Sequence, residues 1–211
     1  MGLSRAGPRV IELSLNEVTA LARKAARGGG FDWASAEEAG RAVRWLTARG
    51  QDGAAALLLR LGLDTVPPRL DGDHLTGDGP LCPIRAGLAL ADLAALPGWS
   101  GLRLRDVTAP ILVLPFAALA AKATGRNLRL RGAGEGVTDG TTMALDGNWT
   151  GTTDLDITPV ARPVAPQPLT ARAHVSLETL DALTAFAHRT YAPATETSRL
   201  RGAGAGQSDN D

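Results

Sequence analysis

Hydrophobic residues recur with a helical period through the first 65 residues of the chain. Ser14 and Glu17 have the spacing of a capping box, and apolar residues every three or four positions after them define one buried face. Asp32 is placed to cap a second helix, and the stretch 53–61 is almost entirely Ala and Leu, which predicts a third, buried helix. This region therefore predicts three helices.

The middle of the chain mixes helix and strand patterns. Prolines and Asp-Gly pairs fill residues 65–83, which predicts a loop. Residues 84–96 alternate as a strand would, but their Ala and Leu content favours a helix. A short apolar strand is predicted at 111–114, followed by a helix at 116–124 that Gly125 ends.

The last third of the chain predicts strands and then one helix. Asp-Gly turns separate three alternating segments, which indicates an antiparallel meander. The predicted strands lie near 128–132, 141–146 and 153–159. Three prolines in 160–168 predict a linker or surface crossing. Ser176 is placed to cap a final helix that runs to about His188.

Together these patterns predict an α+β fold, with an N-terminal helical segment, a central β-α-β with an antiparallel meander, a C-terminal helix and an irregular tail. The helical segment is 1–65, and the α+β segment 66–190 packs on it as a single domain. A Gly-rich tail covers 191–211.

Charge and composition narrow the function classes. The chain has 22 basic and 22 acidic residues, so it has no global field that would attract nucleic acid or an anionic membrane. Glu37 and Glu38 begin the second predicted helix and would repel phosphates, which argues against a DNA-binding helix pair. Arginine greatly outnumbers lysine, a bias typical of a GC-rich bacterial genome.

Targeting and metal signals are weak throughout. No apolar stretch reaches the roughly 18 residues of a membrane span, and the N-terminus lacks a signal-peptide pattern, so the expected location is the cytoplasm. The single cysteine, Cys82, excludes an intramolecular disulfide and a multi-cysteine zinc site. No histidine spacing typical of a metal site occurs, and no pattern identifies a cofactor.

A glycine-rich loop follows the predicted strand at 128–132. A dinucleotide site would need a helix directly after the glycines, and a turn and a strand follow instead, so a plain turn is favoured. Residues 130–139 are nevertheless echoed by 200–209, with seven of ten positions identical. Chance in a chain rich in Arg, Gly, Ala and Leu is one explanation.

The other explanation of this repeat is a pair of anion-binding loops, in which backbone N–H groups and an arginine hold a carboxylate or phosphate. The candidate ligand-binding residues are Arg131, Gly132, Gly134, Arg199, Arg201, Gly202 and Gly204.

Polar side chains suited to acid–base chemistry concentrate near the C-terminus. His188, Tyr191 and Glu196 are the candidate catalytic residues. A solvated tail would have the same composition.

Trp45 lies off the apolar face of its predicted helix, as an interface contact would, although it could equally cover a loop of the same chain.

Both ends of the chain resemble one known group of proteins. Ser14-Leu15-Asn16-Glu17, the segments 22–28 and 36–42, and Trp45-Leu46 are similar to the opening of an uncharacterised proteobacterial protein family, and 191–211 resembles its ending. The resemblance extends over essentially the whole chain. It implies no activity, because none is assigned to that family.

Two function classes remain open. The first is a binding or accessory protein that takes a small anionic ligand or serves a bacterial metabolic complex, with a protein partner or a second copy as its neighbour. The second is a small enzyme that acts on an anionic metabolite through the C-terminal polar residues. The lack of catalytic spacing favours the first.

Overall fold

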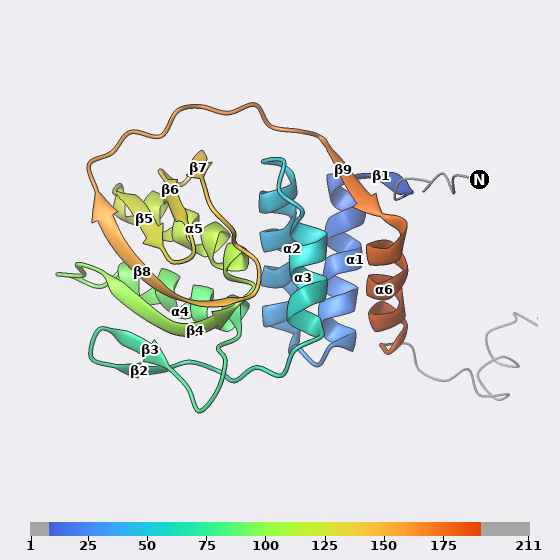
Figure 1. Cartoon of the computed structure of the whole chain (residues 1–211), viewed down its shortest axis with the longest axis horizontal. Coiled ribbons are helices and arrows are strands. Elements are labelled where there is room, and N and C mark those ends of the chain that lie inside the picture. Colours follow the sequence, from blue (N-terminus) through green and yellow to red (C-terminus); the bar gives the residue numbers. More distant parts are fainter. Residues whose placement is uncertain (1–8, 191–211) are drawn as a thin grey trace, which may run out of the picture.

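A computed structural model of the protein describes residues 9–190. Four helices form one side of the molecule, and a large sheet with two further helices forms the other (Figure 1). The four helices are α1 (Leu15–Gly28), α2 (Trp33–Thr47), α3 (Gly53–Leu61) and α6 (Leu177–His188). None of the described helices is both long and apolar enough to cross a membrane.

The helix starts are the ones that the sequence predicts. Ser14 and Glu17 form the expected capping box, in which each side chain accepts the backbone N–H of the other residue. Asp32 caps α2 by accepting the Ser35 N–H at 2.8 Å. These side chains satisfy N–H groups that have no partner within the helix, so they fix where each helix begins.

A small two-stranded sheet joins the two ends of the described chain. Strand β1 (Val10–Ser14) pairs antiparallel with β9 (Arg172–Ser176), and each strand leads directly into a helix capped by its serine. Helices α1 and α6 then pack closely, because a Cβ on Gly28 would lie 1.7 Å from the carbonyl oxygen of Phe186. The fold therefore contains two matching β–α units that close on each other.

The large sheet has seven strands in the order β2-β3-β4-β8-β5-β6-β7. The strands are β2 (Arg69–Asp71), β3 (His74–Thr76), β4 (Leu102–Thr108), β5 (Asn127–Arg131), β6 (Glu135–Thr138), β7 (Met143–Leu145) and β8 (Thr152–Val160). Only the β3–β4 pair is parallel among the paired strands of the described sheet. Helices α4 (Pro83–Ala94) and α5 (Leu114–Thr124) pack on one face of the sheet, over fully buried leucines such as Leu104 and Leu130.

The α+β class is confirmed. A central β-α-β unit is present, but its first strand is β4 and not the predicted strand 111–114. Strands β4 and β5 both run antiparallel to β8, which makes them parallel to each other, with α5 connecting them. The helix predicted at 84–96 is α4, and the cap of α5 at Gly125 has the expected left-handed conformation, with φ +65°.

Three predictions in this region were wrong. Residues 111–113 belong to a 3-10 helix, η1 (Pro110–Val113), and Leu114 begins α5, so this apolar segment leads straight into the helix and pairs with no strand. The predicted loop 65–83 contains β2 and β3. The predicted antiparallel meander is present but consists of β5, β6 and β7. Strand β6 was not predicted, and the predicted third strand, β8, lies between β4 and β5.

Residues 161–171 form the predicted linker. They contain no helix or strand and run from the end of β8 across the molecule to β9 (Figure 1). The linker therefore carries the last strand and helix away from the large sheet and back to the N-terminal helices.

Candidate functional site

The residues proposed for anion binding and catalysis are not brought together. Arg131 ends β5, and Gly132 and Gly134 lie in the loop before β6, whereas His188 ends α6 on the opposite side of the molecule (Figure 1). The other candidates lie outside the described residues, so their roles stay predictions. They are Tyr191, Glu196, Arg199, Arg201, Gly202 and Gly204.

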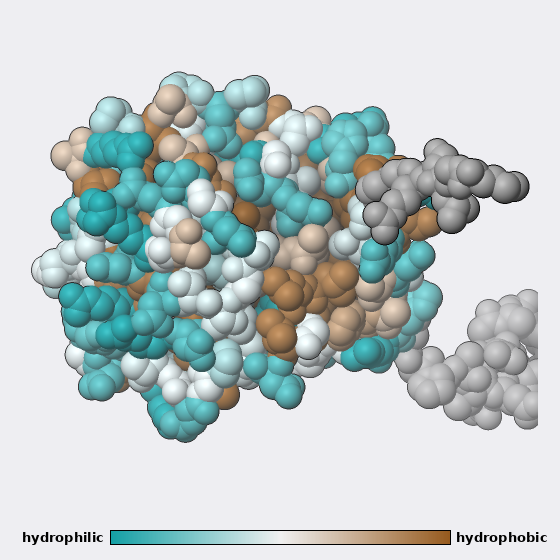
Figure 2. Space-filling model, in the orientation of Figure 1, coloured by the Kyte–Doolittle hydropathy of each residue, from teal (hydrophilic) through white to brown (hydrophobic). Residues whose placement is uncertain are grey.

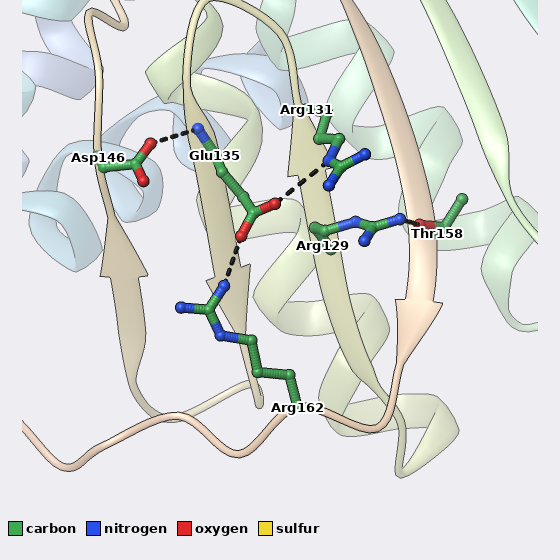
Figure 3. Close-up of polar contacts among 6 residues, drawn as sticks. All are labelled: Arg129, Arg131, Glu135, Asp146, Thr158 and Arg162. Atoms are coloured by element: carbon green, nitrogen blue, oxygen red, sulfur yellow. Dashed lines mark hydrogen bonds and ion pairs between the residues drawn. The ribbon is translucent and has the colours of Figure 1, made fainter.

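Arg131 takes part in an ionic cluster centred on Glu135. The Arg131 Nε lies 3.2 Å from one carboxylate oxygen of Glu135, and Arg162 from the linker pairs with the other oxygen (Figure 3). Beside them, Arg129 donates to the Thr158 hydroxyl at 3.2 Å. A single carboxylate therefore joins β5, β6 and the linker.

The glycine loop packs against the loop that follows β7. A Cβ on Gly134 would lie 2.2 Å from the carbonyl oxygen of Asp146, so only glycine allows this close approach. The Gly132 N–H donates to the Gly134 carbonyl at 3.0 Å, and the Glu135 N–H donates to the Asp146 carboxylate at 2.7 Å. These two amides already bind acceptors of the same chain, and an external anion at Arg131 would compete with Glu135. Anion binding here stays a prediction.

Further ion pairs lie on the same face of the sheet, opposite α4 and α5. Asp154 on β8 accepts the Asp106 N–H at 2.8 Å and pairs with Arg105 at 2.6 Å. The donated N–H, with the Arg105 guanidinium beside it, lowers the pKa of the Asp154 carboxyl. We call Arg105, Arg131, Glu135, Asp154 and Arg162 the charged sheet face.

The side chains elsewhere in residues 9–190 do not form a metal centre. Within that range no three His, Cys, Asp or Glu side chains gather closely enough to hold a metal ion. Cys82 is buried, with the Arg60 Nε 3.3 Å from its sulfur. Trp45 is half-buried with the Arg49 guanidinium 3.8 Å above its ring, and its proposed role as an interface contact stays a prediction.

An apolar cavity of about 460 Å³ lies between α3 and the loop after β7. Its walls come from three separate parts of the chain: α3, the η1 region and the segment 145–150. The lining residues are Gln51, Asp52, Ala55, Ala56, Leu59, Ala109, Ile111, Leu145, Gly147, Asn148, Trp149 and Thr150.

Polar groups line only part of the cavity, and most are already engaged. The Asn148 Oδ1 accepts both the N–H and the hydroxyl of Thr150, at 3.0 and 2.7 Å. One Asp52 carboxylate oxygen accepts the Ala55 N–H at 2.9 Å and caps α3. Asp52 is the only ionisable residue among the lining residues.

Trp149 is fixed in position from behind. Its side chain is buried, and its indole N–H donates to the Asp146 carbonyl at 2.6 Å. Since the N–H is already bound, the ring can offer a ligand only its carbon surface. Asp146 also accepts the Glu135 N–H, so one residue connects the cavity wall to the charged sheet face.

The backbone is strained where it borders the cavity. Ala109 has φ +42° and ψ +57°, a left-handed conformation that costs an alanine about 1–2 kcal/mol. Its N–H donates to the Gly151 carbonyl at 2.7 Å, and its side chain is buried. Strain of this kind concentrates at functional sites, where the surrounding structure maintains it.

Apolar surface continues from the cavity along α3. Leu59 is 38% exposed and Leu63, just after the helix, is 40% exposed. Figure 2 shows the hydrophobic area that gathers over α3. The predicted burial of α3 therefore holds for one face, which includes Ala54, Leu57 and Leu61, while other apolar residues of the helix are partly exposed. A signal was present, because apolar residues continue around the helix beyond the width of one buried face.

Comparison with known proteins gives a family without an assigned activity. Residues 13–97 match the family described as "Protein of unknown function (DUF3726)". This segment includes α3, Gln51 and Asp52, but not the cavity wall at 109–111 and 145–150. No curated protein and no solved structure matches the chain. Residues 13–97 are thus similar to a family of unknown function, which agrees over that segment with the expected resemblance to an uncharacterised protein family.

Proposed function

We propose that the protein is a binding or accessory protein, and that it holds a small, largely apolar ligand in the cavity beside α3. The volume of about 460 Å³ falls within the range of roughly 300–1,000 Å³ that is usual for small-molecule sites. Walls that are mainly aliphatic and aromatic, with a few polar groups, are also typical of such sites. The cavity is the observation that supports the proposal.

Binding is favoured over catalysis by the chemistry of the lining. A reaction by general acid–base catalysis needs groups that exchange protons within reach of the ligand, and Asp52 alone among the lining residues is ionisable. The enzyme alternative depends on His188, Tyr191 and Glu196, of which only His188 lies within the described residues. The strained Ala109 supports a binding role for this region, because a preformed wall lowers the entropy cost of binding.

A neutral solvatochromic dye, Nile red, tests the proposal. We expect saturable binding to the wild-type protein, and at least a tenfold loss of affinity in Ala56→Phe, whose ring would fill the cavity beside α3. The matched control is Ala185→Phe on the exposed face of α6, which should bind as the wild type does. Equal dye binding by Ala56→Phe and the wild type, with both variants folded by circular dichroism, would contradict the proposal.

A further inference from the structure

The charge of the cavity lining indicates which class of apolar ligand it accepts, and this inference rests on the proposed function. We infer that the ligand carries a protonated amine, which is bound by the Asp52 carboxylate at the mouth of the cavity while the apolar body contacts Trp149 and the aliphatic walls.

Asp52 has one carboxylate oxygen left for a ligand. Its Oδ1 is committed to the Ala55 N–H, at 2.9 Å, and no protein group described in residues 9–190 binds the second oxygen. The side chain is exposed where it borders the cavity. A charge-assisted hydrogen bond from an ammonium group to this oxygen would leave the helix cap intact.

No positive side chain lies in the lining of this cavity, which includes neither Lys nor Arg. Asp52 and Gln51 also border a smaller pocket whose lining includes Arg172, and Arg172 pairs with Glu12 at 3.5 Å. Arg60 is the basic residue of α3, and it is directed elsewhere, with its guanidinium 4.6 Å from the Phe31 ring and its Nε 3.3 Å from the Cys82 sulfur. A carboxylate or phosphate ligand would meet only Asp52 as a fully charged group, and like charges repel.

The remaining polar and aromatic groups suit the same ligand. The Gln51 side-chain carbonyl can accept a second N–H of an ammonium group next to Asp52. The Trp149 ring is part of the lining and suits the apolar body of such a ligand. The helix dipole at the start of α3 opposes a cation, but this partial charge is smaller than the full charge of Asp52 that lies over it.

A series of probes with one ring and three head groups tests the inference. Calorimetry would measure the binding of 2-phenylethylamine, 2-phenylethanol and 3-phenylpropionate to the wild-type protein at pH 7. We expect the amine to bind at least tenfold more tightly than the alcohol, and the acid to bind more weakly than the alcohol. Added salt should reduce the preference for the amine and leave the affinity of the alcohol unchanged.

Asp52→Asn isolates the charge, because asparagine caps a helix as well as aspartate does. In this variant the amine should bind within about twofold of the alcohol, and the alcohol should bind as it does to the wild type. The control is Asp32→Asn, which changes the corresponding cap of α2 and should preserve the preference for the amine.

The outcomes separate the two proposals. If the alcohol binds as tightly as the amine, and Ala56→Phe abolishes both, the cavity is a ligand site but the inferred head group is wrong. A preference for the amine that persists in Asp52→Asn also contradicts the inference. If none of the three probes binds while Nile red still does, only the inferred head group is wrong. If Nile red does not bind either, the proposed function fails together with the inference.

Discussion

The charged sheet face and the cavity differ in whether their side chains have binding partners within the same chain. On the charged sheet face, Glu135 binds two arginines, and Asp154 binds Arg105 and a backbone N–H. In the cavity, the apolar walls face open space and one oxygen of Asp52 lacks a protein partner in the described structure. Two groups of the anion site predicted from the sequence already bind groups of the same chain: Arg131 pairs with Glu135, and the Gly132 N–H donates to the Gly134 carbonyl. Apolar walls and polar atoms without a partner in the chain indicate an external ligand better than charged side chains that already pair with each other.

The largest effect is expected where these two regions meet. Gly134→Ala would place a Cβ against the Asp146 carbonyl, which also accepts the indole N–H of Trp149. We expect the free energy of unfolding to fall by about 3 kcal/mol, and the Trp149 fluorescence to change as the loop moves.

Urea denaturation of Gly134→Ala measures this loss. Gly62→Ala is the control, because its new Cβ would have its nearest neighbours at an ordinary 3.7 Å. A wild-type midpoint for Gly134→Ala would show that the loop adjusts freely, and the described link between the two regions would then be wrong.

A smaller effect should distinguish the cavity wall from an ordinary buried position. In Ala109→Gly, the relief of left-handed strain offsets the lost methyl burial, so the free energy of unfolding should stay within about 0.5 kcal/mol of wild type. Ala117→Gly in α5 removes an equally buried methyl group from a helix and should cost about 2 kcal/mol. Chemical denaturation of both variants checks the difference, and equal losses would contradict the strain at Ala109.

The smallest effect concerns the charged sheet face. Folding lowers the pKa of Asp154. The ionised carboxylate therefore stabilises the folded protein fully at pH values above its pKa in the unfolded chain, which is about 3.9. This stabilisation is lost as the pH falls through the lower pKa of the folded protein. Since Asp154 is half exposed, the contribution should be below about 1 kcal/mol. Asp154→Asn should therefore be slightly less stable than wild type at pH 7, and the difference should shrink below pH 4. Thermal unfolding across this pH range measures it, and a constant difference would contradict the assignment.

Local signals predicted the helices well. The caps at Ser14, Asp32 and Ser176 involve residues three positions apart, so they can be recognised without the rest of the fold. Strands were harder, because their partners are distant in sequence. Strand β1 pairs with a segment about 160 residues away, and its own alternation covers only Ile11–Ser14, which is too short to identify a strand without its partner.

The cavity could not have been predicted from the sequence. Its lining comes from residues 51–59, 109–111 and 145–150, none of which forms a recognisable motif. Only the fold brings α3 and Trp149 to the same space. The left-handed Ala109 also gave no signal, since alanine is not the residue expected in that conformation.

The pairing of β1 with β9 has a consequence for biosynthesis. Helix α6, which covers part of α1, is translated roughly 150 residues after α1, and at about 5–20 residues per second this delay amounts to roughly 8–30 s. Throughout that interval the nascent chain must keep the α6-facing side of α1 exposed on the ribosome. If the last strand and helix complete the fold, a chaperone should contact this face of α1 during synthesis and dissociate once α6 emerges.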